Sequence, residues 1–598
     1  MPQPIQVRAK TLNQRADTQT RTEDPRITNA LLYQLSHIGI SDRKITHFLK
    51  KSKRDAVLFA HATFFCEHYE HKIFMTMKRH IATVALLSAS VAIWAQSFGY
   101  KNPVIPGFHP DPSVCRVDSD YYLVTSSFEF APGVPLFHSR DLVNWEQIGH
   151  CLTRPEQLPL EKSGSWCGIY APTIRYHDGT FFTITTNVAG GGNFIVHTKD
   201  IRGEWSAPVW LRQEGIDPSL FWDEDGTCYM VSNPNDGIWL CQIDPFTGEQ
   251  KTESKLIWEG MGGRYPEAPH IYKKDGWYYL MIAEGGTEYG HSETIARSRK
   301  IDGPYLGNPS NPILTHYCQA AENNPIQGTG HADLVQAHDG SWWMVCLAFR
   351  PVSGNNHVMG RETFLAPVSW PKGGWPVVNG NGTIALQMDV PTLPQHPFAA
   401  PAAEADFSKP LGLEWNYLRN YSPANYSVKG GKLTLTATTE SIDAEGSPTF
   451  VGRRQQHANF VAETKVTLYG KNVGDEAGMT LYMKCYTHYD ISLVRKADGK
   501  AYARLRYRLG ELRHAEKEIE VSGKDVTLRI EGSPEFYSFS VSTDGHNFTD
   551  LGRMNTRFIS SEAGGGFTGA YIGLFAQKTS ARGKAQGVFD RFSYKAKD

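Results

Sequence analysis

Three carboxylates stand at the start of apolar, strand-like segments of the chain. Asp111, Asp217 and Glu267 lie in the runs HPDPSVCRV, GIDPSLFW and PEAPHIYK. Carboxylates that lie close together push one another's pKa values apart, so that one holds a proton while its neighbour is ionised. A general acid and a general base need those two states. A single Asp-Pro at a strand start is also typical of a turn or cap, but three acids in phase indicate a shared catalytic site.

The elements that must position these acids form a repeat. Each repeat has a polar or Asp-Gly turn followed by an aromatic run, as in DSDYYLV from Asp118, DGTFFTI from Asp178, DGTCYMV from Asp225, DGWYYLM from Asp275 and DGSWWMV from Asp339. Asp-Gly between two apolar runs is a strong hairpin signal, because Gly tolerates the positive φ of a tight turn. Self-similarity about every 45 to 65 residues in an all-β pattern predicts a five-bladed β-propeller.

The strand before each turn starts with a short segment, often containing Pro, which we call its entrance. The five entrances begin at Asp111, Ala171, Asp217, Ala268 and His331. The first strands of propeller blades line the central axis, so side chains at their entrances face one funnel. Three acids there are costly unless their charge is used or compensated. The repeat therefore predicts that the three acids converge.

The length of 598 residues is too great for one hydrophobic core. We expect the propeller over residues 98–390 and a Pro/Ala-rich linker over 391–405. Alternating apolar and polar segments such as KLTLTATT and DVTLRIEG follow, and they predict a second all-β domain, a β-sandwich, over 406–598. In that domain, GGGFTGAYIGLFA from Gly564 begins with three glycines, which indicate a loop of special backbone conformation.

Charge and cysteines exclude several classes of function. Lys plus Arg number 61 and Asp plus Glu 62, a net charge of −1, so nothing in the balance favours nucleic acid or an anionic membrane. The nine cysteines form no C-x-x-C pair, and a zinc site is unsupported. A neutral partner fits this composition better.

The first 95 residues do not resemble the rest. MKRHIATVALLSASVAIWAQ from Met77 has the basic start, short apolar run and small final residues of a secretory signal peptide. We expect a signal peptide over 77–95, an upstream extension outside the fold over 1–76, and an exported protein, periplasmic or extracellular, whose mature form is not inserted in a membrane. The alternative is a genuine N-terminal segment with an internal membrane anchor.

Long ordered motifs of the chain resemble glycoside hydrolase family 43. They are NPVIPGFHPDPSV from Asn102, SSFEFAPGVPLFHSRDLVNW from Ser126, GIDPSLFWDEDG from Gly215, RYPEAPHIY from Arg264, AEGGTEYGHSETIARSRKIDGPY from Ala283, GTGHADLV from Gly328 and MGRETFL from Met359. The likeness is greatest to β-xylosidases and α-L-arabinofuranosidases, which join a five-bladed propeller to a C-terminal concanavalin-like β-sandwich. The resemblance implies hydrolysis of a terminal sugar with inversion, in which Asp111 is the general base, Glu267 the general acid, and Asp217 orients that acid and raises its pKa.

The resemblance also implies substrate-binding residues. His331 matches an axial histidine that helps to organise the site, and Arg361 matches a pocket arginine for which an ion pair with Glu362 or another acid is the alternative. Phe567 matches an aromatic residue that the sandwich inserts toward the active site, with a packed core position as the alternative. Tyr170 stands where the family often has Trp, which affects the choice of sugar, and Phe128 is expected in the same pocket.

The substrate implied is a terminal β-1,4-xylose of xylo-oligosaccharides or xylan side chains. The alternatives are an α-L-arabinofuranosidase on arabinoxylan or arabinan, and a bifunctional enzyme. A sugar-binding propeller without catalysis would not need all three acids, and acids at the funnel argue against a protein-interaction propeller. No cofactor is required, while a structural calcium ion near the axis and metal ligation by His331 stay open. The oligomeric state does not follow from the sequence.

Overall fold

The computed structural model describes residues 99–597 except 236, 318–323 and 523–524. The predicted upstream extension over 1–76 and the predicted signal peptide over 77–95 lie outside the described residues. Nearly all elements of the described chain are β-strands. Its short helices are η2 (Pro155–Gln157), η4 (Pro423–Asn425), η5 (Thr556–Ile559) and α4 (Ser561–Gly564).

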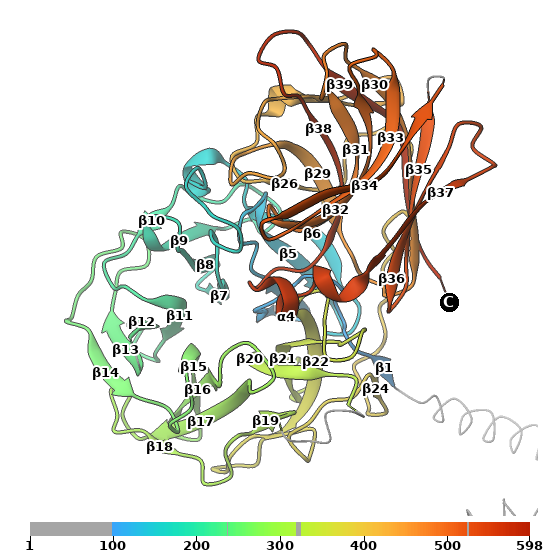
Figure 1. Ribbon diagram of the computed structural model, residues 1–598. Helices are drawn as coiled ribbons and strands as arrows, with labels where there is room; N and C mark the ends of the chain where they lie inside the picture. The colour runs from blue at the N-terminus through green and yellow to red at the C-terminus, as the bar shows by residue number, and fades with distance from the viewer. Residues whose placement is uncertain (1–98, 236, 318–323, 523–524, 598) are drawn as a thin grey trace, which may run out of the picture. The chain divides into compact units, whose positions relative to one another are not determined.

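Five antiparallel sheets of the described chain stand around a common centre (Figure 1). Blade 1 contains β2 (Ser113–Val117), β3 (Asp120–Val124), β5 (Gly133–Ser139) and β6 (Glu146–Leu152). Blade 2 contains β7 (Thr173–His177), β8 (Thr180–Asn187), β9 (Gly192–Thr198) and β10 (Val209–Trp210). Blade 3 contains β11 (Ile216–Trp222), β12 (Cys228–Asn235), β13 (Gly237–Gln242) and β14 (Lys255–Trp258).

Two further sheets complete this circle of blades. Blade 4 contains β15 (Glu267–Lys274), β16 (Trp277–Glu284), β17 (Ser292–Ser298), β18 (Leu306–Gly307) and β19 (Leu314–Thr315). Blade 5 contains β20 (Gln327–Gln336), β21 (Trp342–Phe349), β22 (Glu362–Ser369) and β23 (Val377–Val378). The first strand of each blade contacts the first strands of its neighbours, so these five strands line the axis. The predicted five-bladed propeller is confirmed.

The hairpins within the blades have the turn chemistry that the sequence indicated. Asp178 and Gly179 both have positive φ (44° and 73°) between β7 and β8. Asp275 and Gly276 do the same (52° and 73°) between β15 and β16. Two consecutive residues with positive φ match the right-handed twist of the strands they join. The Asp-Gly pairs therefore fix the register of each hairpin.

The entrances of the inner strands share a second backbone feature. Asp111, Asp217, Ala268 and His331 have φ between 48° and 56°, a left-handed conformation that is rare for residues other than Gly. The pairing register also shifts at this point in β11, β15 and β20. Such irregularities bend a strand and redirect its side chains. The same local bend thus repeats where the chain reaches the funnel.

The start of the described chain closes the ring onto blade 5. The short strand β1 (Tyr100–Lys101) pairs with β24 (Gln387–Met388), and the Tyr100 hydroxyl donates to the Leu365 carbonyl at 2.7 Å. Ile105 forms an isolated bridge with Thr363 of β22. Residues from both ends of the propeller segment therefore hold the first and last blades together.

The C-terminal part consists of two packed eight-stranded sheets in the described chain. One contains β25 (Glu404–Ala405), β27 (Tyr426–Val428), β28 (Leu433–Thr436), β30 (Phe460–Tyr469), β35 (Val526–Gly532), β36 (Phe536–Ser542), β37 (Thr549–Asn555) and β39 (Gln586–Ala596). The other contains β4 (Phe130–Ala131), β26 (Asn416–Leu418), β29 (Thr449–Arg454), β31 (Glu476–Lys484), β32 (Thr487–Arg495), β33 (Ala501–Leu509), β34 (Leu512–Val521) and β38 (Tyr571–Gln577). Alternate residues of both sheets fill one hydrophobic core, and the predicted sandwich is confirmed.

One strand of the second sheet comes from the propeller segment. β4 pairs with β26 through Ala131 opposite Tyr417 and Phe130 opposite Leu418. The Phe130 ring stacks on Tyr571 of β38 with centroids 4.1 Å apart. Propeller and sandwich therefore share a sheet as well as side-chain contacts.

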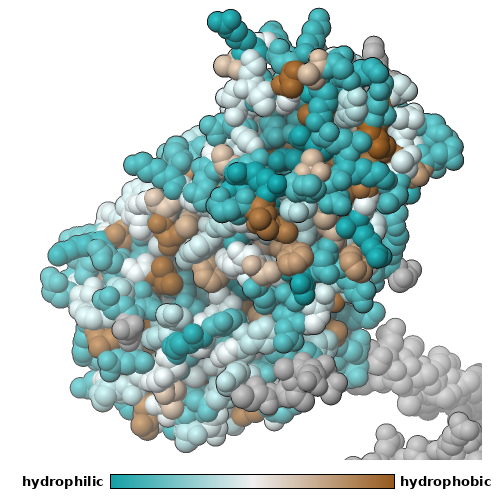
Figure 2. Space-filling view, in the orientation of Figure 1, coloured by the Kyte–Doolittle hydropathy of each residue, from teal (hydrophilic) through white to brown (hydrophobic). Residues whose placement is uncertain are grey.

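The surface of the molecule is mainly hydrophilic on the face shown in Figure 2, where hydrophobic residues occur in small separate groups. A mixture of this kind is ordinary for a protein that buries most of its large apolar side chains. Among the described residues, no helix combines the length and apolarity needed to cross a bilayer.

Candidate active site

All eight residues predicted for the site line one cavity of about 110 Å³. They are Asp111, Phe128, Tyr170, Asp217, Glu267, His331, Arg361 and Phe567. Asp217, Glu267 and His331 come from the first strands of blades 3, 4 and 5, and Asp111 lies just before β2 of blade 1. Phe567 reaches the cavity from the sandwich, between α4 and β38. The fold thus brings together residues that are up to 456 positions apart, from Asp111 to Phe567.

Asp111 is held by a cation and a hydroxyl. Arg361 donates from Nη1 to Asp111 Oδ1 at 2.7 Å, and Ser126 Oγ donates to Asp111 Oδ2 at 2.5 Å. The Asp111 and Arg361 side chains are both buried, and a buried charge needs such a partner. The alternative pairing of Arg361 with Glu362 does not occur, because Glu362 accepts instead from Arg350 at 2.6 and 2.8 Å.

The other two acids have raised pKa values. Burial, followed by the neighbouring Asp111, raises the pKa of Glu267 to about 7, and Arg361 opposes that shift. Burial, Glu267 and Asp111 raise the pKa of Asp217 well above its usual range, although Asp217 accepts a hydrogen bond from the Ala268 amide at 3.2 Å. The excess of negative charge over positive charge in a dry cavity therefore keeps protons on the cluster.

His331 lies beside the acids. Its Nδ1 is 3.6 Å from Asp111 Oδ1 and 4.0 Å from Asp217 Oδ2. Burial lowers the pKa of His331, so the ring is neutral at pH 7. Within the described part of the chain, no group of three or more His, Cys, Asp and Glu side chains has the arrangement of a metal site. Ligation by His331 and a structural calcium ion stay predictions, and no step below depends on them.

Aromatic rings form the remaining walls of the cavity. Phe128 and Tyr170 lie 5.1 Å apart between centroids. The Arg361 guanidinium carbon is 5.6 Å from the Phe128 ring and 5.8 Å from the Phe567 ring, within the range of cation–π attraction. Phe567 also packs against a cluster of buried aromatic residues, so its cavity position and its packing role coexist.

A larger cavity of about 520 Å³ adjoins the small one. Both are lined by Glu267, Thr287 and Phe567. Tyr265, which is 60% exposed, lies in the outer wall of this larger cavity. In the same wall, the backbone amide of His357 donates to the Glu562 carboxylate at 3.0 Å. The Nδ1 atom of His357 is 2.6 Å from that carboxylate. Since His357 belongs to the propeller and Glu562 to α4, the two domains together build this second space.

Two polar residues of the site were not predicted. Ser126 bonds Asp111, and Thr287 Oγ1 accepts from Arg361 Nη1 at 3.0 Å. Both lie within motifs that carry the family resemblance, SSFEF and AEGGTEYG. Their place in these motifs was the signal in the sequence that could have identified them as site residues. Their hydroxyl types are common in loops, so nothing in their local pattern marks them as partners of an acid and an arginine.

This arrangement suits proton transfer on both sides of a bond. Asp111, with Arg361 and Ser126 as partners, is built to accept a proton from a bound molecule. Glu267, with a pKa of about 7, is partly protonated at neutral pH and is suited to donate one. Asp111 lies before the first strand of blade 1 and Glu267 begins that of blade 4, so the two carboxyl groups reach the cavity from different blades.

Comparison with known proteins supports the same chemistry. Residues 100–376 match the model of "Glycosyl hydrolases family 43" and residues 404–595 that of "Beta xylosidase C-terminal Concanavalin A-like domain". The non-reducing end α-L-arabinofuranosidase BoGH43B of Bacteroides ovatus is 41% identical over 86% of this chain and 98% of its own length. The xylosidase/arabinosidase of Butyrivibrio fibrisolvens is 38% identical over 83% of this chain and 98% of its own.

Solved structures show the same likeness. The structure described as "Bacteroides ovatus Xyloglucan PUL GH43B" has a TM-score of 0.80 and 40% identity, and the match covers 83% of this chain and all of that one. Sequence and fold agree over both domains. The chain therefore belongs to glycoside hydrolase family 43 and is a glycosidase.

Proposed function

We propose that the protein is an exo-acting, inverting glycosidase that releases a terminal pentose from oligosaccharides. Asp111 is the general base, Glu267 the general acid, and Asp217 the residue that orients Glu267 and keeps its pKa raised. The residues that bind the sugar are Arg361, His331, Phe128, Tyr170 and Phe567.

One observation carries this assignment: Glu267 lines both cavities, whereas Asp111 and Asp217 line only the small one. A terminal sugar in the small cavity and its leaving group in the large one place the bond to be broken at Glu267. A general acid must stand at that bond to protonate the leaving oxygen. The base must stand on the far side of the sugar ring, and we assign that place to Asp111, which lines the small cavity and not the large one.

The reaction then follows from the two protonation states. The Asp111 carboxylate takes a proton from a water molecule, whose oxygen attacks the anomeric carbon. Glu267 gives its proton to the glycosidic oxygen as the carbon–oxygen bond breaks. An inverting enzyme needs about 6.5–9.5 Å between the two carboxyl groups to hold that water, and the proposal requires this separation between Asp111 and Glu267. Burial and Asp111 raise the pKa of Glu267, while Glu267 raises the pKa of Asp217, because adjacent negative charges in this dry site repel.

The size of the small cavity supports exo action. Its volume of about 110 Å³ is well below the roughly 300–1,000 Å³ of pockets for drug-sized ligands. One sugar ring fits a space of that order, whereas a continuous polysaccharide does not. Phe567 from the sandwich lines both cavities and narrows the site, which favours release of single sugars from chain ends.

Xylose is the first sugar to test, with xylo-oligosaccharides and xylan side chains as substrates. The relative from Bacteroides ovatus, named an α-L-arabinofuranosidase, supports arabinofuranose as a second candidate. The Butyrivibrio relative is named for both sugars, which supports a bifunctional enzyme. Tyr170, whose ring packs beside Phe128, is the wall residue through which the two sugars would be distinguished, since its hydroxyl adds a polar group to an apolar face.

The decisive experiment compares aryl β-xyloside, aryl α-L-arabinofuranoside, xylobiose and arabinoxylan as substrates, with NMR of the first product anomer. We expect release of a single pentose with inverted configuration. A product with retained configuration would contradict the inverting mechanism. Cleavage within long chains, without release of monosaccharide, would contradict exo action.

We also propose that the protein is exported. The support is the signal-like segment over residues 77–95. N-terminal sequencing of protein recovered from outside the cytoplasm should give a first residue close to Gln96. A mature protein that retains residues before Met75 would refute the proposal.

A further inference from the structure

The loop that carries Phe567 depends on unusual backbone conformations. It follows α4, a single helical turn that Ser560 caps through its side chain at the Ala563 amide. Gly565 and Gly566 then have φ of 73° and 91°. The last carbonyls of a helix have no partner within it, so this loop needs donors from elsewhere to keep its shape.

Lys484, at the end of β31, supplies those donors. Its Nζ donates to the carbonyls of Gly564 and Gly565, the latter at 2.7 Å. The residue is 1% exposed, and its Nζ lies over the Tyr486 ring at 4.5 Å from the centroid. Burial lowers the pKa of Lys484 to about 8. A buried ammonium is costly unless it is fully used, and here it caps the C-terminus of α4, a position that favours a cation.

Tyr486, in the same turn between β31 and β32, holds a second partner of Phe567. The Tyr486 hydroxyl accepts from Trp166 Nε1 at 3.1 Å. Trp166 packs edge-on against Phe567 with centroids 5.4 Å apart. A Cβ on Gly566 would come within 2.8 Å of Trp166 Cδ1, so the loop and the indole fit closely.

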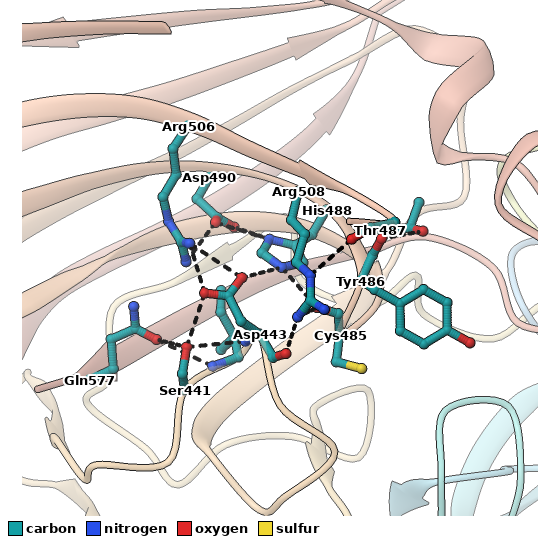
Figure 3. A network of polar contacts seen from close by, with 12 residues as sticks. Ser441, Asp443, Cys485, Tyr486, Thr487, His488, Asp490, Arg506, Arg508 and Gln577 are labelled. Atoms are coloured by element: carbon teal, nitrogen blue, oxygen red, sulfur yellow. Dashed lines mark hydrogen bonds and ion pairs between the residues drawn. The ribbon is translucent and has the colours of Figure 1, made fainter. Parts of the chain in front are cut away.

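The turn itself is anchored by a buried network of charges (Figure 3). The Cys485 carbonyl accepts from Arg508 Nη1 at 2.9 Å and lies 3.2 Å from His488 Nε2. Asp443 accepts from Arg506 at 3.0 Å and lies 3.0 Å from the same His488 nitrogen. Networks of this kind restrict side chains and backbone to one arrangement. Lys484 and Tyr486 are therefore presented from a rigid base.

On the other side, Phe567 contacts the residue that holds the proposed base. Arg361 Nη2 donates to the Phe567 carbonyl at 3.4 Å, while Arg361 Nη1 donates to Asp111 at 2.7 Å. A continuous set of contacts thus runs from Lys484 through the glycine loop and Phe567 to Arg361 and Asp111.

We propose that Lys484 and Tyr486 are positioning residues of the active site, which fix the Phe567 loop and Trp166 so that the sandwich sets the width of the sugar cavity and the placement of Arg361. This inference rests on the proposed function. Neither residue touches the cavity itself, and both act through Phe567. A small displacement of groups that hold a substrate or base is enough to lower turnover strongly.

A double-mutant cycle tests the inference. Lys484→Met keeps the length of the side chain and removes the donor, and we expect about a tenfold lower kcat/KM on an aryl pentoside, mainly through KM. In a Phe567→Ala background, the same substitution should change kcat/KM by less than twofold, because residues that act through one another are not additive. Equal losses in both backgrounds would overturn the inference, as would an unchanged kcat/KM in Lys484→Met.

Milder variants and a control distinguish the positioning role from a loss of activity caused by misfolding. Tyr486→Phe removes one hydroxyl, and we expect about a threefold loss that likewise disappears in Phe567→Ala. Lys484→Arg restores donors to the two carbonyls and should regain part of the activity. Lys517→Met is the matched control, since Lys517 Nζ also donates to a carbonyl of the sandwich, that of Asp550 at 2.8 Å, and its kcat/KM should match that of the unaltered protein.

Calorimetry of the binding of the released pentose compares Lys484→Met in the unaltered and Phe567→Ala backgrounds without turnover. If the unaltered protein hydrolyses no glycoside, the proposed function fails, whereas additive losses in an active enzyme refute only the positioning role. Weaker pentose binding in Lys484→Met that persists unchanged in Phe567→Ala would also refute it.

Discussion

Two groups of buried acids in this molecule have opposite environments. The funnel acids, Asp111, Asp217 and Glu267, share the cation Arg361. The sandwich acids, Asp443, Glu476 and Asp490, lie among several cations, and Figure 3 shows Asp443 and Asp490 beside Arg506. Arg504 is 2.6 Å from Glu476, and Arg506 lies 2.9 Å from Asp490 and 3.0 Å from Asp443. In each group two of the three acids lie on strands, Asp217 and Glu267 in the funnel and Glu476 and Asp490 in the sandwich.

The protonation states of the two groups differ accordingly. Burial raises the pKa of both Glu267 and Glu476, but Arg506 and Arg504 outweigh burial at Glu476 and lower its pKa to about 2. At Glu267, burial and Asp111 prevail over Arg361, and the pKa rises to about 7. Burial alone therefore does not mark a catalytic acid. The balance of nearby charge decides whether a buried carboxyl stabilises the fold or carries a proton.

The largest expected effect comes from removal of the proton donor in the funnel. Glu267→Ala should lower kcat/KM on xylobiose or a matching disaccharide by about 10²–10⁴-fold, the usual contribution of a general acid. An aryl glycoside with a good leaving group needs little protonation, so its loss should be much smaller. Steady-state kinetics on both substrates checks this, with circular dichroism as the control for folding. Equal losses on the two substrates would contradict the role of Glu267.

The next effect concerns the stability of the sandwich. Arg504→Met leaves the Glu476 carboxylate with less compensation, and breaking a buried ion pair costs about 3–5 kcal/mol. We expect a lower free energy of unfolding and unchanged kcat/KM in the folded enzyme. Urea denaturation measures the change, and Arg513→Met, at an exposed position of the adjacent strand β34, serves as the control. If Arg504→Met lowers the free energy of unfolding no more than Arg513→Met does, the sandwich acids do not stabilise the fold in the way that the comparison with the funnel acids requires.

A further effect is on the pH dependence of activity. Glu267 donates only when protonated, so kcat/KM on a disaccharide should fall about tenfold per pH unit above pH 7, the pKa of that carboxyl. The aryl substrate should show a weaker alkaline decline. A disaccharide profile that stays flat to pH 9 would show that the funnel does not hold the proton.

The free energy of unfolding should depend on pH in the acidic range, through Glu476 of the sandwich. The pKa of Glu476 is lower in the folded state, about 2 against 4.5, so its contribution is complete above about pH 4.5 and is lost as pH falls toward 2. Unfolding free energies measured over pH 2–6 should fall on the acid side, with a smaller slope in Arg504→Met. An equal slope in that variant would assign the acid sensitivity to other groups.

Much of the fold and the site followed from local sequence patterns. The Asp-Gly turns and phased strand entrances predicted the blades, because both signals lie within a few residues. The resemblance added Arg361, His331 and the aromatic walls, and all eight predicted residues line one cavity. The two-residue strand β4 carries no such signal, since its pairing with β26 joins positions 286 apart, Ala131 and Tyr417.

Contacts between distant segments account for what was missed. His357 and Glu562 are 205 positions apart, and the contact of Lys484 with Gly564 spans 80 positions. A lysine at a strand end is usually solvated, so its burial becomes visible only when the sandwich is folded. The sandwich acids were also missed, because their meaning depends on arginines of neighbouring strands.

The pairing of β4 with β26 has a consequence for separating the propeller and the sandwich into fragments. A fragment that begins at residue 404 would contain a sandwich in which β26 has lost its partner β4 and become an edge strand, and an unpaired edge is prone to join other chains. A chain that ends there would leave β4 and the stacked Phe130 without their support. The two domains therefore form a single unit for protein engineering, and exchange of modules between relatives should succeed only when both are exchanged together.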